Sequence, residues 1–182
     1  MYEDLSFDTE PPASVFSLPG AAERTIAVRS LSKGYGIAGA RIGYCHGPEA
    51  AMAAIRSIQT FYTYCAATPM QYEAAHILRT GDTWLEQTRK QYAEAAQLAA
   101  DCLGVPHPAA GTFLFFDTRP FRRQGESPDD FLNRCRQAGA MLTPGTASGS
   151  MFGDWARLCF TVVSLEDLRD ALNQMQAVLQ RV

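Results

Sequence analysis

A serine, a lysine and an arginine near the start of the chain have the spacing of a reactive amine beside an anion-binding pair. Ser30 lies three residues before Lys33, and Arg41 lies eight residues after it. A buried or partly buried lysine that has lost its proton is a nucleophile for carbonyl compounds, and a serine with an arginine can hold a phosphate. The three residues predict a site for an aldehyde that carries a phosphate, of which pyridoxal phosphate is the common example.

The glycines of this stretch allow tight turns and close approach of a ligand, but they also imitate a different motif. Gly34, Gly36 and Gly39 fit the G-x-G-x-x-G dinucleotide fingerprint. That fingerprint needs a helix that begins within the glycines and an acidic residue about 20 positions later. Residues 40–45 are β-prone and residues 53–60 contain no acid, so NAD and FAD are not expected ligands.

Hydrophobic periodicity predicts a mixed α/β fold in two parts. Residues 1–24 are expected to form a loop. The patterns that follow predict strands at 25–30, 41–45, 112–117 and 156–163, and helices at 48–62, 69–78, 82–103, from Ser127 to about Gly139, and from Ser164 onward. Ser127 and Ser164 stand as N-caps. One face of the long helix is expected to carry Trp84, Thr88, Gln91 or Tyr92, Ala95, Ala99 and Leu103.

These elements divide the chain into a partial domain at 1–80, a connecting helix at 81–104 and a smaller domain at 105–182. The first part has two strands and two helices, which is too little sheet to bury them well. The last part has the strands and helices of a complete small domain.

Composition excludes several classes of function. A net charge of −3 gives no basic field for nucleic acid or an anionic membrane surface. No apolar run approaches the roughly 20 residues that span a bilayer, and the acidic start lacks the basic and apolar flanks of a signal peptide. Five widely spaced cysteines, at 45, 65, 102, 135 and 159, predict reduced thiols in the cytoplasm and no metal site.

Residues 30–43 resemble, position by position, the lysine-attachment signature of the class I/II pyridoxal-phosphate-dependent aminotransferases of fold type I. The shared pattern is a serine, an apolar residue, a serine, the Schiff-base lysine, small residues, and then arginine, an apolar residue and glycine. The resemblance implies that Lys33 is the attachment and catalytic residue, and that Ser30 and Arg41 hold the cofactor phosphate. It also implies a remnant of a large α/β domain, a long connecting helix and a small α+β domain.

Two further residues take roles from this resemblance. Arg157, in the run Ala-Arg-Leu-Cys-Phe, is implied to clamp the substrate α-carboxylate. Tyr2, in Tyr-Glu-Asp-Leu, is implied to hydrogen-bond the phenolic oxygen of the cofactor. The family aspartate that pairs with the pyridine nitrogen would lie three residues before Tyr2, ahead of Met1. The Gly-rich phosphate loop and the ring-stacking aromatic are also missing, so the chain resembles the C-terminal half of the family and is expected to be truncated at its N-terminus.

The resemblance implies an aminotransferase that moves an amino group between an α-amino acid and a 2-oxo acid. The intact family member is expected to be a homodimer, with the aromatic run 61–64 at its interface. A lyase or synthase of the same fold, an inert fragment and an effector-sensing domain remain alternatives. The chain by itself is expected to bind pyridoxal phosphate weakly, because the ring partner and half of the phosphate site are missing.

Overall fold

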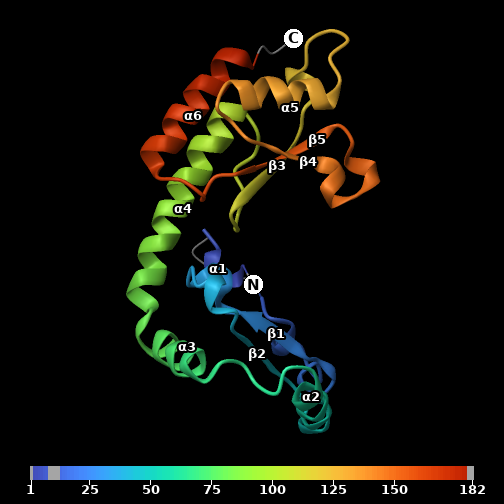
Figure 1. The fold of residues 1–182 in the computed structure, drawn as a ribbon, viewed down its shortest axis with the longest axis vertical. Coiled ribbons are helices and arrows are strands. Elements are labelled where there is room, and N and C mark those ends of the chain that lie inside the picture. Colours follow the sequence, from blue (N-terminus) through green and yellow to red (C-terminus); the bar gives the residue numbers. More distant parts are fainter. Residues whose placement is uncertain (1, 8–12, 180–182) are drawn as a thin grey trace. The chain divides into compact units, whose positions relative to one another are not determined.

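The computed structural model describes residues 2–7 and 13–179, and the backbone forms two compact units. The first is Met1–Arg89 and the second is Lys90–Val182. The division falls inside the longest helix, α4 (Asp82–Leu103), labelled in Figure 1. This helix has the bounds that the sequence predicts.

The first unit is built around one antiparallel pair of short strands. Strand β1 (Ala27–Ser30) pairs with β2 (Gly43–His46), so that Ser30 lies opposite Gly43. The helices of this unit are α1 (Leu31–Gly34), α2 (Glu49–Tyr62) and α3 (Thr68–Thr80), with 3-10 turns at Glu3–Leu5, Val15–Ser17, Ala22–Arg24 and Ala38–Ala40. The predicted N-terminal loop thus contains three short turns, and its residues 1 and 8–12 lie outside the described part.

The core of the first unit is small. Leu31, Ile42 and Ala74 are buried together, with Tyr35 and Met70 packed against them. Helix α2 has no buried residue. A two-stranded sheet cannot cover its own apolar side chains, and Val28 on β1 is accordingly 78% exposed. The expected shortage of sheet in this part of the chain is confirmed.

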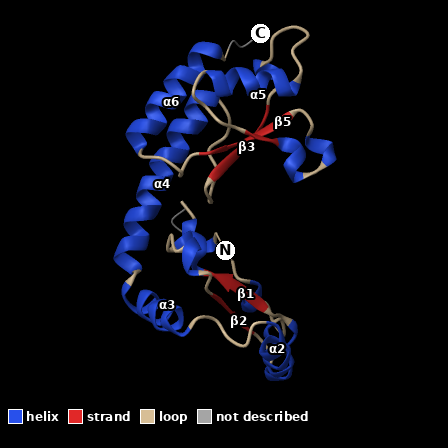
Figure 2. Ribbon diagram, viewed as in Figure 1, coloured by secondary structure: helices blue, strands red, loops and turns tan. Residues whose placement is uncertain are grey.

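The second unit is a three-stranded antiparallel sheet with α-helices on one side and 3-10 turns at Gly145–Ser148 and Ser150–Phe152 (Figure 2). The strand order is β3 (Phe113–Asp117), β5 (Trp155–Cys159), β4 (Thr143–Pro144). The helices are α5 (Pro128–Gln137), α6 (Leu165–Val178) and the C-terminal half of α4. The face that packs on the helices carries the buried side chains of Leu114, Phe116, Ala156 and Leu158.

The predicted helix starts in this unit are confirmed. Ser127 Oγ accepts the N–H of Asp130 at 3.2 Å, and Ser164 Oγ accepts the N–H of Asp167 at 3.1 Å. Strand β5 is shorter than the predicted 156–163. The pairing runs out with the hydrogen bond from Phe160 N to Thr112 O, because β3 begins at Phe113 and offers residues 161–163 no partner. No helix in residues 2–7 and 13–179 is long and apolar enough to cross a bilayer.

Candidate functional site

Lys33 stands on a single helical turn directly after β1. Ser30 ends the strand and caps this turn, since its Oγ accepts the N–H of Ser32 at 3.2 Å. Leu31 and Gly34 of the turn are buried, whereas Lys33 is exposed. Helix α1 turns Leu31 and Gly34 inward, which leaves Lys33 on the outer side.

Arg41 has an unusual backbone conformation, and the residue after it is hydrogen-bonded to the lysine turn. Its φ of 52° is in the left-handed region, which a non-glycine residue adopts at some cost and which recurs at functional sites. Its Nη1 donates to the carbonyl of Ala38 at 2.9 Å. Leu31, the first residue of the lysine turn, donates its N–H to the carbonyl of Ile42 at 3.4 Å. Arg41 therefore lies one residue away from a direct contact with that turn.

The lysine turn is also held by residues from far away in the sequence. Gly34 lies against Asp4, so that a Cβ at residue 34 would be 2.9 Å from Asp4 Oδ2. Arg89 Nε donates to the Asp4 carbonyl at 2.6 Å. The segment that begins at Tyr2 therefore packs on α1. Tyr2 itself is half-buried, and its carbonyl accepts the N–H of Leu5 at 2.9 Å.

Trp84 packs against Gly36, three residues after Lys33. Gly36 has a φ of 69°, and a Cβ on it would be 3.3 Å from the Trp84 ring. The same ring stacks on Tyr35, with centroids 6.4 Å apart. Burial and the nearby Asp4 carboxylate raise the pKa of Tyr35 above its ordinary value. Trp84 is 44% exposed, whereas its neighbour Leu85 is buried.

The donor set of this turn fits a phosphate-bearing aldehyde. Lys33 offers an exposed amine and Ser30 a hydroxyl. Arg41 offers an exposed guanidinium, which donates one hydrogen bond, to the carbonyl of Ala38. Amine, hydroxyl and guanidinium are the groups that a carbonyl carbon and a phosphate require. The structure thus brings these three predicted residues to one strand–turn–strand segment.

Arg157, the fifth predicted residue, belongs to the second unit and lies in the middle of β5. Its Cζ lies 5.1 Å from the centroid of the Phe113 ring, and its Nη2 donates to Thr143 Oγ1 at a long 3.4 Å. Arg157 is partly buried. Four other arginines of this unit form ion pairs with carboxylates: Arg119 with Asp117, Arg122 with Asp154, Arg134 with Glu126, and Arg169 with Glu94. Among the described residues no carboxylate pairs with Arg157, so its charge is available to an acidic ligand.

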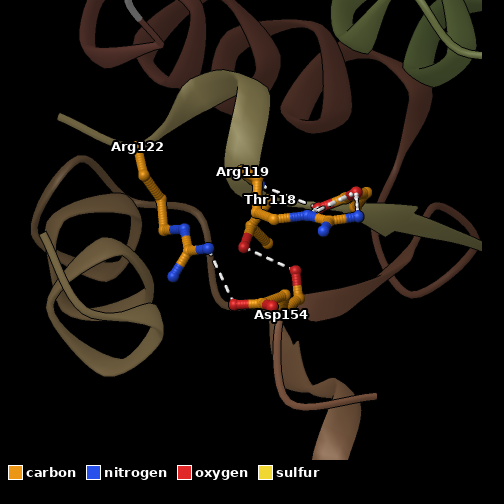
Figure 3. A network of polar contacts seen from close by, with 5 residues as sticks. Thr118, Arg119, Arg122 and Asp154 are labelled. Atoms are coloured by element: carbon orange, nitrogen blue, oxygen red, sulfur yellow. Dashed lines mark hydrogen bonds and ion pairs between the residues drawn. The ribbon is translucent and has the colours of Figure 1, made fainter. Parts of the chain in front are cut away.

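A polar network joins the end of β3 to the start of β5 (Figure 3). Thr118 donates to the Asp154 carbonyl twice, from its N–H at 2.8 Å and from its Oγ1 at 2.7 Å. The Asp154 carboxylate accepts from Arg122 Nη2 at 2.7 Å. These contacts fix the backbone three residues before Arg157. Sequence reasoning missed them, although an arginine-rich segment after a strand that ends in aspartate could have suggested them.

Comparison with known proteins gives a consistent result. Residues 1–175 match the model of the family described as aminotransferase class I and II. The chain is 29% identical over 179 residues to LL-diaminopimelate aminotransferase of Natranaerobius thermophilus, covering 96% of this chain and 45% of that protein. It is 28% identical over 187 residues to aromatic-amino-acid aminotransferase 2 of Thermococcus litoralis, covering 99% and 47%.

The fold comparison agrees with the sequence comparison. The crystal structure of the aromatic aminotransferase from Pyrococcus horikoshii superposes with a TM-score of 0.86 at 28% identity, covering 98% of this chain and 49% of that chain. The chain spans about half the length of the relatives it matches. Their names do not favour a lyase or synthase. The chain belongs to the class I and II aminotransferase family and has the mixed α/β architecture of part of the fold-type-I enzymes.

Proposed function

We propose that this chain carries the lysine, phosphate-binding and carboxylate-binding parts of a pyridoxal-phosphate-dependent aminotransferase. The reaction is the transfer of an amino group between an α-amino acid and a 2-oxo acid. The observation that carries the proposal is the lysine turn, in which Ser30 caps the helix of Lys33 and the β1–β2 pairing returns Arg41 to the same segment.

Each residue of the first unit has a role that follows from its chemistry. Pyridoxal phosphate supplies an aldehyde carbon and an electron-withdrawing ring. The Nζ of Lys33 would hold that carbon, and the free Lys33 amine would be a base for the proton on the substrate α-carbon. Ser30 and Arg41 would hold the phosphate, and the Tyr2 hydroxyl would donate to the phenolic oxygen.

In the second unit, Arg157 binds the substrate α-carboxylate. A planar guanidinium makes two parallel hydrogen bonds to a carboxylate, which fixes orientation as well as position. The Phe113 ring lies 5.1 Å from Arg157 Cζ and accepts none of its N–H groups in the plane, so these donors would remain available to a carboxylate. This orientation step contributes several kcal/mol in enzymes that align a reacting bond.

The organisation of the whole protein is part of the proposal. We assign residues 1–80 to part of the large domain, 81–104 to the connecting helix and 105–182 to the small domain, and we assign a homodimer in a reducing compartment such as the cytoplasm. Phe61, Tyr62 and Tyr64 are 89%, 83% and 82% exposed, and so many large apolar side chains in one short stretch support an interface with a second copy.

A titration with two ligands tests whether Ser30 and Arg41 bind the cofactor phosphate. The chain is titrated with pyridoxal phosphate and with pyridoxal, and the visible absorbance band is followed. The proposal expects pyridoxal phosphate to bind more tightly, and it expects Arg41→Ala and Ser30→Ala to reduce that preference. Arg56→Ala, which removes an exposed arginine of α2, is the matched control. Equal affinities for the two ligands in the parent chain would overturn the assignment of Ser30 and Arg41.

A further inference from the structure

Asp117 lies on the same face of the second-unit sheet as Arg157. Phe115 is paired with Arg157, and Asp117 is paired with Trp155. Paired residues of antiparallel strands, and residues two apart on one strand, point to the same side. Asp117 and Arg157 are thus diagonal neighbours, a relationship that puts Cα atoms about 7–8 Å apart and within reach of a long side chain.

Arg157 nevertheless turns to Phe113, at the opposite end of β3. The carboxylate of Asp117 is already occupied by Arg119, two residues further along the chain. Arg119 Nε lies 3.0 Å from Oδ1 and 2.9 Å from Oδ2, its Nη2 also binds Oδ2, and its backbone N–H donates to Oδ1 at 2.9 Å. Both oxygens of Asp117 therefore have donors.

We propose that Arg119 is a positioning residue, which keeps the Asp117 carboxylate away from Arg157 and so leaves the Arg157 guanidinium free for the carboxylate of the substrate. This inference rests on the proposed role of Arg157 as the carboxylate clamp. Without Arg119, the diagonal carboxylate of Asp117 becomes an internal competitor, because opposite charges at this separation attract across the sheet face.

A second carboxylate near β5, that of Asp154, is also bound by an arginine. Asp154 lies three residues before Arg157 and is bound by Arg122 at 2.7 Å. Arg119 and Arg122 belong to one short segment after β3, so each carboxylate at this end of the sheet has its own arginine from that segment. The pKa of Asp117 is held below its ordinary value, first by the hydrogen bond from Arg119 and more weakly by the charge of Arg122, so Arg119 is the principal partner.

The first test measures the internal competition directly and needs no ligand. The Asp117 carboxyl is titrated by carbon NMR in the full chain with Arg119→Gln and with the double variant Arg119→Gln/Arg157→Gln. If Arg157 moves to the vacated carboxylate, the pKa of Asp117 is lower in the single variant than in the double variant. Identical titrations in the two variants would overturn the proposal, since Arg157 would then not respond to the loss of Arg119.

The second test measures what the competition does to a ligand. Succinate is titrated against chains in a Trp84→Phe background, so that fluorescence reports on Trp155 alone. Arg119→Gln is expected to weaken binding roughly two- to fivefold, the range for a partly exposed ion pair, and Asp117→Asn added to it is expected to restore binding. Arg123→Gln, which removes an exposed charge from the same segment, is the control for net charge.

The results of the two tests distinguish the positioning role of Arg119 from the carboxylate-binding role of Arg157. If succinate does not bind the parent chain, or binds Arg157→Gln equally well, the proposed role of Arg157 fails, while the titration of Asp117 still reports on the competition. If Arg119→Gln weakens binding no more than Arg123→Gln does, or if Asp117→Asn does not restore it, Arg119 has no positioning role.

Discussion

The guanidinium of Arg157 lies over the ring of Phe113, with Cζ 5.1 Å from the ring centroid. The two residues are on neighbouring strands and are diagonal neighbours on one face, because Phe113 pairs with Cys159 and Arg157 pairs with Phe115. An aromatic ring attracts a cation to its face and offers no acceptor to the N–H edge. Phe113 can therefore hold the arginine in place without using the hydrogen bonds that a carboxylate needs.

Phe113→Leu is expected to weaken succinate binding about two- to fivefold, which corresponds to the loss of a cation–π contact at an exposed site. Phe113→Tyr keeps an aromatic face and should bind as the parent does. The measurement is the same fluorescence titration of Trp155. Equal affinity in the leucine and tyrosine variants would show that the ring does not hold Arg157.

Thr118→Val should lower the free energy of unfolding of the second unit by about 1 kcal/mol, the usual net contribution of one buried hydrogen bond. Thr118 is 1% exposed, and its hydroxyl donates to Asp154 O at 2.7 Å. The measurement is urea unfolding, followed by Trp155 fluorescence in a Trp84→Phe background. Thr146→Val, at an exposed position, is the control, and a loss no larger than in this control would contradict the assigned bond.

The ion pair between Glu126 and Arg134 predicts how stability depends on pH. The two side chains are only 9% and 10% exposed, and Arg134 Nε lies 2.7 Å from Glu126 Oε1. The hydrogen bond from Arg134 holds the pKa of Glu126 below its ordinary value. A carboxyl with a lowered folded pKa stabilises above its unfolded pKa, and that contribution is lost as the pH falls through the folded value.

Glu126→Gln should therefore lower the stability of the second unit at pH 7 by about 2–4 kcal/mol, because it leaves a largely buried arginine without its counterion. The difference between parent and variant should shrink as the pH falls below the ordinary range of a glutamate. Urea unfolding at pH 7 and pH 3 provides the comparison, with exposed Glu166→Gln as control. A difference that stays constant over this range would rule out the ion pair as its source.

Local features of the site could be predicted from the sequence because they depend on neighbours in the chain. The caps at Ser127 and Ser164 involve residues three positions apart. The lysine turn is likewise closed within the segment from Ser30 to Gly43 by one strand pair. Such contacts follow from residue type and short spacing, which a single sequence displays.

The remaining features depend on strand register and on packing between distant segments. Phe113 meets Arg157 only because β3 and β5 pair in one register and not the next, and a shift by one residue would turn the ring to the opposite face. The contacts of Asp4 and Trp84 with the glycines after Lys33 join segments that no local pattern relates. Lys33 is exposed because the opposite side of α1, with Leu31 and Gly34, packs against the rest of the unit.

Chemical trapping identifies which amine of the chain binds the cofactor. Lys33 and Lys90 are the only lysines in the sequence, so Lys90 is an internal control. The 182-residue chain is incubated with pyridoxal phosphate at a low and at a high concentration, reduced with borohydride, digested and analysed by mass spectrometry. The account predicts that the reduced adduct lies on Lys33 and is lost in Arg41→Ala at low cofactor concentration. Equal labelling of Lys33 and Lys90, unaffected by Arg41→Ala, would contradict it.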